Sequence, residues 1–181
     1  ALSAFMSLIV LGVGALVLAY CARYFREHEA KDAVFGGQLL AFAGAMFGLV
    51  TTDDLMVLYT FWEVTSVLSF LLIGYSGHRI FARRSAITAL IVTTVGGLAM
   101  LAGLIMLAHM AGSWRISGVL AAAPGLLADD GGRVLLEVAV GLVLIGALTK
   151  SAQAPFHFWL PGAMAAPTPV SAYLHAAAMV K

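Results

Sequence analysis

This sequence carries very little charge. Only 10% of its 181 residues are Asp, Glu, Lys or Arg, whereas 62% are hydrophobic and the mean hydropathy is +1.00. A soluble domain carries about a quarter charged residues, so this chain has too few to cover the surface of a soluble globule. An outer surface that faces lipid has this composition, and a membrane protein is therefore predicted.

Other features are scarce as well. The single cysteine, Cys21, excludes an intrachain disulfide. The net charge is +1 and no basic cluster occurs, so nucleic acid is not an expected partner. No metal-ligand spacing, phosphate loop, nucleophile elbow or dinucleotide fingerprint is present. We therefore expect neither a metal nor a cofactor, and we do not expect an enzyme that works alone.

Long apolar runs make up most of the chain. A helix needs about 20 apolar residues to cross the hydrocarbon core, and several runs reach or approach that length. The predicted spans are 4–24, 33–50, 55–75, 85–112, 134–160 with a break, and 169–181. Residues 113–133 are too polar to span and are expected to lie along the interface. The sequence thus predicts an all-α, polytopic transmembrane helix bundle, with 1–181 as a single transmembrane domain.

Basic residues are distributed unevenly among the predicted loops. The first and third loops hold six Lys or Arg residues, whereas the second and fourth hold two, Arg115 and Arg133. The positive-inside rule places the basic loops in the cytoplasm, so residue 1 is expected on the outer side of the cell membrane. Because the chain does not begin with Met and its last apolar run has no helix-stop signal, we expect an internal fragment of a longer protein.

One acidic residue lies deep inside a predicted span. Glu63 comes eight residues after the start of span 55–75, which places it roughly 12 Å deep at about 1.5 Å per residue. A lone charge at mid-bilayer costs at least about 2.5–3.5 kcal/mol, so a functional carboxylate is the first hypothesis. The alternative is a carboxyl that is neutral or paired for structural reasons.

A lysine precedes a cluster of prolines in the fifth run. Pro155 follows Lys150 by five residues and removes a backbone donor, so the helix is predicted to break there. Broken helices at membrane depth line polar or watery cavities and form ion sites in transporters. The freed carbonyls are expected to meet water or polar side chains, with His157 and Gln153 the nearest. The alternative is a lysine at the membrane edge with its ammonium among the head groups.

Two further ionisable residues lie in the last run. His175 and Lys181 are six residues apart, which is about 9 Å along a helix axis, so they do not form one ligand cluster. A histidine titrates near neutral pH, and a buried lysine is pulled towards its neutral form, so both suit proton transfer. A buried histidine bonded to a carbonyl is an equally good interpretation of His175.

Two short pairs have structural interpretations. Asp53 and Asp54 precede span 55–75 and fit a helix N-terminus, where an acid caps free amides. Gly96 and Gly97 are adjacent in span 85–112 and are typical of close helix packing.

Several sequence motifs resemble those of one protein family. Residues 52–56 (TDDLM), 61–63 (FWE) and 71–75 (LLIGY) resemble the fifth membrane helix of the antiporter-like proton-pumping subunits of respiratory complex I. Four further segments resemble the seventh and eighth helices of that family. They are residues 149–155 (TKSAQAP), 159–161 (WLP), 166–171 (APTPVS) and 175–177 (HAA). The order and spacing of the motifs also agree with the family.

Within this family, residues 160–169 (LPGAMAAPTP) resemble the A subunit of Mrp-type sodium/proton antiporters. The largest antiporter-like subunit of complex I commonly carries Asp where this chain has Gly162. The same complex I subunit often lacks the lysine found here at Lys181. Both positions favour the antiporter branch.

The resemblance implies a larger fold of inverted repeats, each with a broken helix, of which this chain is about the first. It implies that Glu63 is the essential glutamate, Lys150 its paired lysine, and His175 and Lys181 members of a central polar axis. The implied function is proton translocation in a Na⁺/proton antiporter complex with other membrane subunits as partners. The alternatives are a proton-pumping subunit of NADH:quinone oxidoreductase, and a purely structural scaffold.

Overall fold

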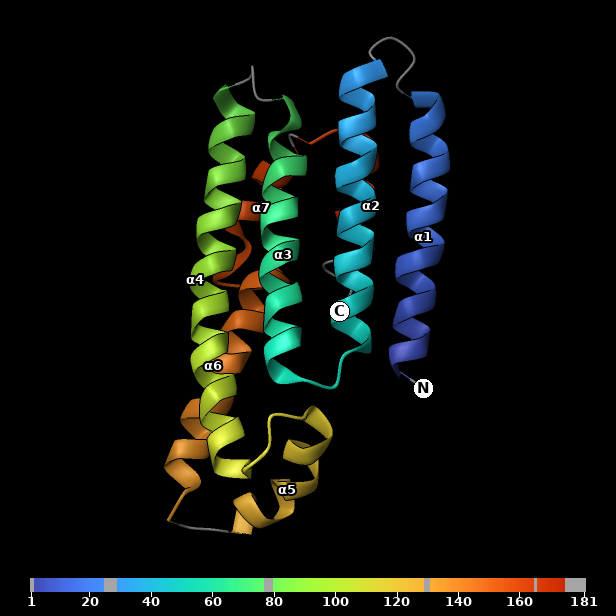
Figure 1. Cartoon of the computed structure of the whole chain (residues 1–181). Helices are drawn as coiled ribbons and strands as arrows, with labels where there is room; N and C mark the ends of the chain where they lie inside the picture. The colour runs from blue at the N-terminus through green and yellow to red at the C-terminus, as the bar shows by residue number, and fades with distance from the viewer. Residues whose placement is uncertain (1, 25–28, 77–79, 129–130, 165, 175–181) are drawn as a thin grey trace.

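The computed structural model describes residues 2–24, 29–76, 80–128, 131–164 and 166–174 (Figure 1). Within these ranges the chain forms helices and no strand, which confirms the all-α prediction. The helices are α1 (Leu2–Tyr24), α2 (Glu29–Thr51), α3 (Leu55–Ile73), α4 (Ile80–Ala111), α5 (Ile116–Ala128), α6 (Arg133–Lys150), α7 (Trp159–Ala163) and α8 (Thr168–Tyr173). The same ranges contain two 3₁₀ turns, η1 (Gly74–Ser76) and η2 (Phe156–Phe158).

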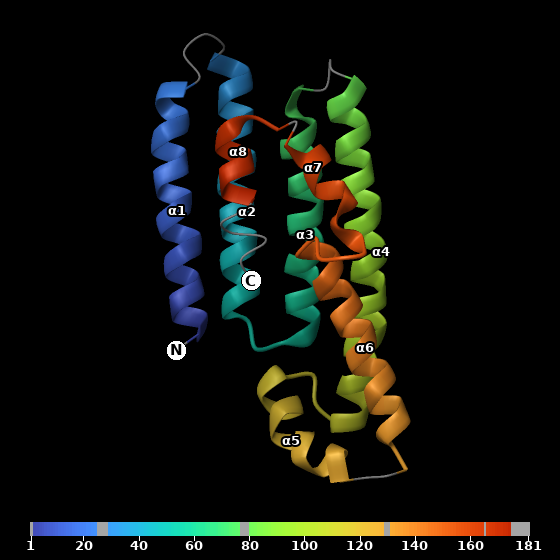
Figure 2. The ribbon, with the colours of Figure 1, turned by 180° about the vertical axis from the view of Figure 1, so that it is seen from behind.

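Four of these helices are long and apolar enough to cross a membrane. They are Leu2–Arg23, Ala33–Thr51, Leu55–Ile73 and Ile80–Ala111. Neighbours along the chain run antiparallel, so α1 and α3 end at the same end of the bundle where α2 and α4 begin, and the α2–α3 connection lies at the other end, with α5 beyond it (Figures 1 and 2). This alternation places the helix ends that flank the two basic loops on the same side of the bundle.

The chain after α6 returns across the bundle. α6 packs against α4, whereas α8 packs against α1 on the opposite side, and α7 lies between them in Figure 2. Tyr173 of α8 is fully buried, and its hydroxyl donates a hydrogen bond to the Val10 carbonyl of α1 (3.0 Å). The segment that follows the break therefore closes the bundle over α1 and α2.

Small residues bring α4 and α6 into close contact. A Cβ atom at Gly103 would lie 2.6 Å from the Ala139 carbonyl oxygen, and one at Gly146 would lie 2.8 Å from the Gly96 carbonyl oxygen. At Gly96 a Cβ would overlap the Thr149 hydroxyl. Glycine at these positions lets the two backbones approach, as is common between membrane helices. Close packing, the predicted role of Gly96, is confirmed.

The predicted break in the fifth run is confirmed. α6 ends at Lys150, the chain turns through η2, and α7 begins at Trp159. The carbonyl of Thr149, at the broken end, accepts a 3.0 Å hydrogen bond from the Trp159 indole nitrogen. His157 and Gln153, the nearest polar candidates in the sequence, are both exposed. Sequence reasoning missed the tryptophan because its indole reaches back to the break from the start of the next helix.

The two aspartates before α3 have different structural roles. Asp54 caps α3, since its Oδ1 accepts from the amides of Met56 (2.9 Å) and Val57 (3.0 Å). Asp53 turns instead to α5 and accepts from the Ser117 amide (2.9 Å) and hydroxyl (2.6 Å). The capping prediction is thus confirmed for Asp54, while Asp53 ties the α2–α3 connection to the first turn of α5.

This tether makes a testable pH prediction. The Ser117 side-chain hydrogen bond, followed by the Ser117 amide, lowers the pKa of Asp53 below its ordinary value of 3.8. A lowered pKa means that the carboxylate form stabilises the tether above pH 3.8, and that this contribution is lost as the pH falls through the lowered pKa. Ser117→Ala is expected to return the pKa of Asp53 towards 3.8, measured by infrared titration of labelled Asp carboxyls. An unchanged Asp53 titration in that variant would contradict the assignment.

Candidate functional site

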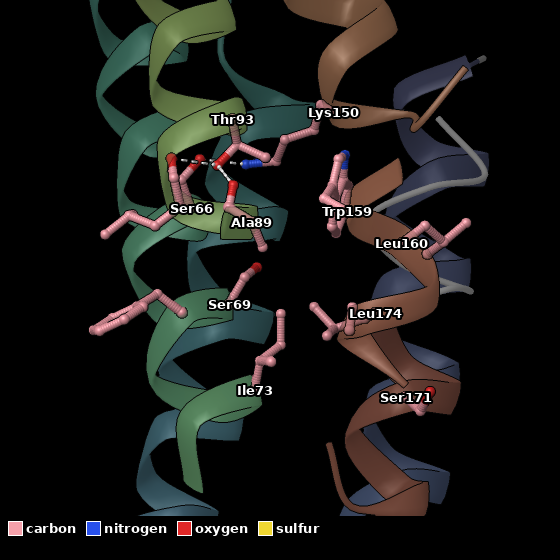
Figure 3. A pocket seen from close by; sticks show the side chains of 13 residues that line it. Ser66, Ser69, Ile73, Ala89, Thr93, Lys150, Trp159, Leu160, Ser171 and Leu174 are labelled. Carbon is pink, nitrogen blue, oxygen red and sulfur yellow. Dashed lines mark hydrogen bonds between the residues drawn. The ribbon is translucent and has the colours of Figure 1, made fainter. Parts of the chain in front are cut away.

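The candidate site is centred on the last residue of α6. Lys150 is 6% exposed, and its side chain extends from the broken end of α6 towards α3 and α4 (Figure 3). The break ends α6 at this residue, and the lysine side chain is buried inside the bundle. A buried ammonium requires partners for its three N–H groups.

Three oxygen atoms of α3 supply those partners. The Lys150 ammonium donates to Thr65 Oγ1 (2.6 Å), Ser66 Oγ (2.8 Å) and the Trp62 carbonyl (3.1 Å). Thr65 and Ser66 are 0% and 2% exposed, so this contact excludes bulk water. The ammonium also lies 5.0 Å from the centroid of the Trp62 ring, within the range of a cation–π interaction.

The two hydroxyls are oriented by the same carbonyl. Thr65 Oγ1 donates to the Trp62 carbonyl at 2.7 Å, and Ser66 Oγ donates to it at 3.2 Å. Their hydrogens are thereby directed to Trp62, so their lone pairs are available to the ammonium. The site therefore holds a positive charge with neutral acceptors.

Glu63 lies on the same helix, one turn before Ser66, and its surroundings are different. Its Oε1 is buried and has no hydrogen-bond partner among the described residues, and the same is true of the neighbouring Trp62 Nε1. Oε1 packs directly against Gly97 of α4, in contact with the position that a Cβ would take. The Glu63 carboxyl interacts electrostatically with Tyr59, one turn earlier on α3, and with the Lys150 ammonium.

The charges of Glu63 and Lys150 therefore interact, but the ammonium donates its hydrogen bonds to other acceptors. Its three N–H groups are matched by Thr65, Ser66 and Trp62 within the part of the chain that the structure describes. A direct Glu63–Lys150 ion pair would require the ammonium to leave at least one of these acceptors. The direct pairing of Glu63 with Lys150 therefore stays a prediction.

A small cavity adjoins the ammonium. Its volume is about 20 Å³, which is room for about one water molecule. Polar groups along its walls include Ser69 and Thr93, and Trp159 and Leu174 form the opposite side (Figure 3). Lys150 lies at one end of the cavity, and Ser171 and Ile73 lie at the other.

Gly97 controls the position of the carboxyl. In Gly97→Ala the new Cβ would overlap Glu63 Oε1, which is the end of a flexible side chain, so the carboxyl is expected to move while the fold is kept. Misplacement of a functional group by about 1 Å can cost a hundredfold in rate, so the ion transport that the sequence resemblance implies is expected to fall at least about tenfold. Transport in vesicles, normalised to the amount of assembled protein, measures this. Gly12→Ala, where nothing lies within 4 Å, is the control and should behave as wild type.

The remaining predicted site residues, His175 and Lys181, lie outside the described residues. Conversely, the sequence analysis did not predict Thr65 and Ser66 as site residues. The available signal was a pair of adjacent hydroxyl residues in the middle of an apolar span, where polar side chains need buried partners. That signal indicates a partner but not its identity, because Lys150 is 85 residues from Thr65 in the chain.

A buried lysine and a partly buried glutamate beside a broken helix are typical of membrane proteins that carry ions. The comparison with protein families agrees with this class. Residues 52–181 match the family described as NADH:quinone oxidoreductase/Mrp antiporter, TM, and the chain belongs to this family.

The sequence is similar to named antiporter subunits. It is 50% identical over 175 residues to the A/B subunit of a probable K(+)/H(+) antiporter of Rhizobium meliloti, covering 97% of this chain and 17% of that protein. It is 46% identical over 180 residues to the A subunit of the Na(+)/H(+) antiporter of Alkalihalophilus pseudofirmus, covering 99% and 22%. The chain thus spans 17% to 22% of the length of these relatives.

Solved structures show the same arrangement. A chain of the Mrp complex from Dietzia sp. superposes with a TM-score of 0.90 at 41% identity, over 99% of this chain and 19% of that chain. A chain of respiratory complex I from Thermus thermophilus gives a TM-score of 0.75 at 23% identity, over 96% and 37%. The second likeness supports the fold alone.

Proposed function

We propose that this chain is part of a subunit that translocates protons in a monovalent cation/proton antiporter complex, with Na⁺ as the exchanged cation. The observation that carries the proposal is the buried Lys150 ammonium, held by neutral oxygens with the Glu63 carboxyl nearby. Two opposite charges inside one lipid-facing bundle are costly, and transport provides the reason to keep them.

The proposed mechanism is a two-state proton relay. In one state Glu63 and Lys150 form an ion pair that keeps the lysine protonated. In the other state the pair is open, and the ammonium in its low-dielectric site gives its proton onward to His175 or Lys181. The cavity beside Lys150 has room for the water that would carry the proton.

A second candidate function has support from the fold. The complex I chain shares this arrangement, so the same relay could serve a proton-pumping subunit of an NADH:quinone oxidoreductase. The antiporter is favoured because the relatives with 46% to 50% identity carry antiporter names.

The proposal extends to partners and location. We infer that the protein works with other membrane subunits in a plasma-membrane complex and that 1–181 forms one transmembrane domain. Residue 1 is placed on the outer side, since the basic loops then face the cytoplasm. In that orientation, α5 faces outwards, and an impermeant thiol reagent should label Ala121→Cys in intact cells.

The test uses the full-length protein with its partner subunits, reconstituted in liposomes that contain a pH-sensitive dye. A Na⁺ gradient is expected to drive proton movement in the opposite direction. Proton movement driven by K⁺ but not by Na⁺ would overturn the choice of cation. Proton movement that needs NADH and quinone and ignores both gradients would favour the second candidate.

A further inference from the structure

We propose that the Thr65 and Ser66 hydroxyls form a second docking position for the Lys150 ammonium, which it occupies after it leaves Glu63 and from which it releases its proton. This inference rests on the proposed relay. It makes Thr65 and Ser66 positioning residues, which hold the ammonium without passing the proton on themselves.

The geometry of the contact supports a distinct docking position. Thr65 Oγ1 and Ser66 Oγ lie 2.6 Å and 2.8 Å from Lys150 Nζ, and both residues are buried. Ser66 comes three residues after Glu63 on α3, so it lies on nearly the same face about one turn further along. The ammonium would therefore move by about 5 Å, along one helix, between a charged acceptor and a neutral pair.

Hydroxyls also suit both protonation states of a lysine. An ammonium has three donors and no acceptor, whereas a neutral amine also has a lone pair that needs a donor. A hydroxyl can accept from the first and donate to the second, but a carboxylate can only accept. Of the two hydroxyls, Ser66 has the longer bond to the Trp62 carbonyl, 3.2 Å against 2.7 Å for Thr65, and is the one that can turn more easily.

Proton release from this position breaks one N–H bond of the Lys150 ammonium. The proton goes to a water molecule in the adjoining cavity, which becomes hydronium. The electron pair of the broken bond stays on Nζ as the lone pair of a neutral amine. The Ser66 hydroxyl then turns from the Trp62 carbonyl and donates to Nζ, so that the lone pair gains a donor. When the amine is protonated again, the hydroxyl turns back.

Within the described part of the chain, the groups that face Lys150 determine how its protonation depends on pH. On α3, the Glu63 carboxyl interacts with the ammonium through its charge, and Tyr59 interacts electrostatically with Glu63. From α4 and α7 the cavity presents Thr93 and Trp159, which do not titrate in the working range. Variants at Thr65 and Ser66 leave all these groups in place.

The experiment combines Thr65→Val and Ser66→Ala in the full-length protein within its complex. Each variant removes a hydrogen bond to a charged group, so the protonated lysine is disfavoured in this position. We expect a lower rate of Na⁺-driven proton movement and a shift of its pH profile to the acidic side by about one pH unit for each lost bond. Thr65→Ser keeps a hydroxyl and should retain the wild-type profile.

Thr60→Val is the matched control. Thr60 lies on the exposed face of α3 and donates to the Met56 carbonyl (2.8 Å), so rate and profile should not change. If the double variant does not assemble, Ser66→Ala alone supplies the pH profile. A wild-type rate and profile in the hydroxyl variants, with transport lost in Lys150→Met, would overturn the second docking position and leave the relay standing. Wild-type transport in Lys150→Met would overturn both.

Discussion

Glu63→Gln is expected to abolish cation-driven proton movement while the protein still inserts and assembles. Gln has nearly the same shape as Glu, so the contact between its side-chain end and Gly97 is kept. What is lost is the negative charge that acts on Lys150. Without that charge, the acceptors described for the ammonium are all neutral, and the two-state cycle has no first state. Vesicles loaded with a pH-sensitive dye measure the loss.

The carboxyl of Glu63 can also be retained but moved. Glu63→Asp keeps the charge and withdraws it by about one bond length from Gly97, so part of the transport should remain. Assembly, followed by purification of the intact complex, should be equal in both variants. Wild-type transport by the Gln variant would show that the carboxyl is neutral or structural, and the relay would be wrong.

Gly96→Ala is expected to have the largest effect on stability. The new Cβ would overlap the Thr149 hydroxyl and lie 2.7 Å from Thr149 Cβ and Cγ2. Since Thr149 is buried in the interface with α4 and precedes Lys150, the two helices must separate locally or the end of α6 must shift. Overpacking of this kind costs about 1–3 kcal/mol. Thermal unfolding in detergent should therefore occur at a clearly lower temperature.

Two further variants distinguish overpacking from a general effect of alanine. Gly141→Ala lies on α6 with nothing within 4 Å of the new Cβ, so it should be neutral or slightly stabilising. Thr149→Ala removes the hydroxyl and Cγ2, two of the three atoms that the alanine at position 96 would meet, and should restore part of the stability. If Gly96→Ala and Gly141→Ala unfolded at the same temperature, the close α4–α6 contact would have no energetic weight.

Adjacent glycines on α4 thus have different partners. Gly96 faces Thr149 on α6, whereas Gly97 faces Glu63 on α3. The sequence predicted close packing for the pair, because small residues are common where membrane helices meet. It did not separate a glycine that sets the distance between helices from one that sets the position of a carboxyl. The turn of about 100° between successive helix residues makes that separation, and only the neighbouring helices show which partner lies on each side.

The break at Pro155 gives a second comparison. Local chemistry predicted it, since proline lacks the amide that a helix needs, and α6 does end at Lys150. The partner of the freed carbonyl was missed, because Trp159 reaches Thr149 only after the chain has turned through η2. Asp53 is similar: capping chemistry was expected of it, but its partner Ser117 is 64 residues away.

The sequence alone determined the membrane class, the helical fold and the two residues, Glu63 and Lys150, whose charge has to be explained. These follow from local quantities: the hydropathy of each run, the cost of a charge in lipid and the absence of an amide at proline. The tertiary structure decided which oxygens hold the ammonium. Thr65 and Ser66 meet Lys150 because the contacts among α3, α4 and α6 bring together groups 84 and 85 residues apart. Partners at such separations depend on how whole helices pack, which no local pattern in the chain encodes.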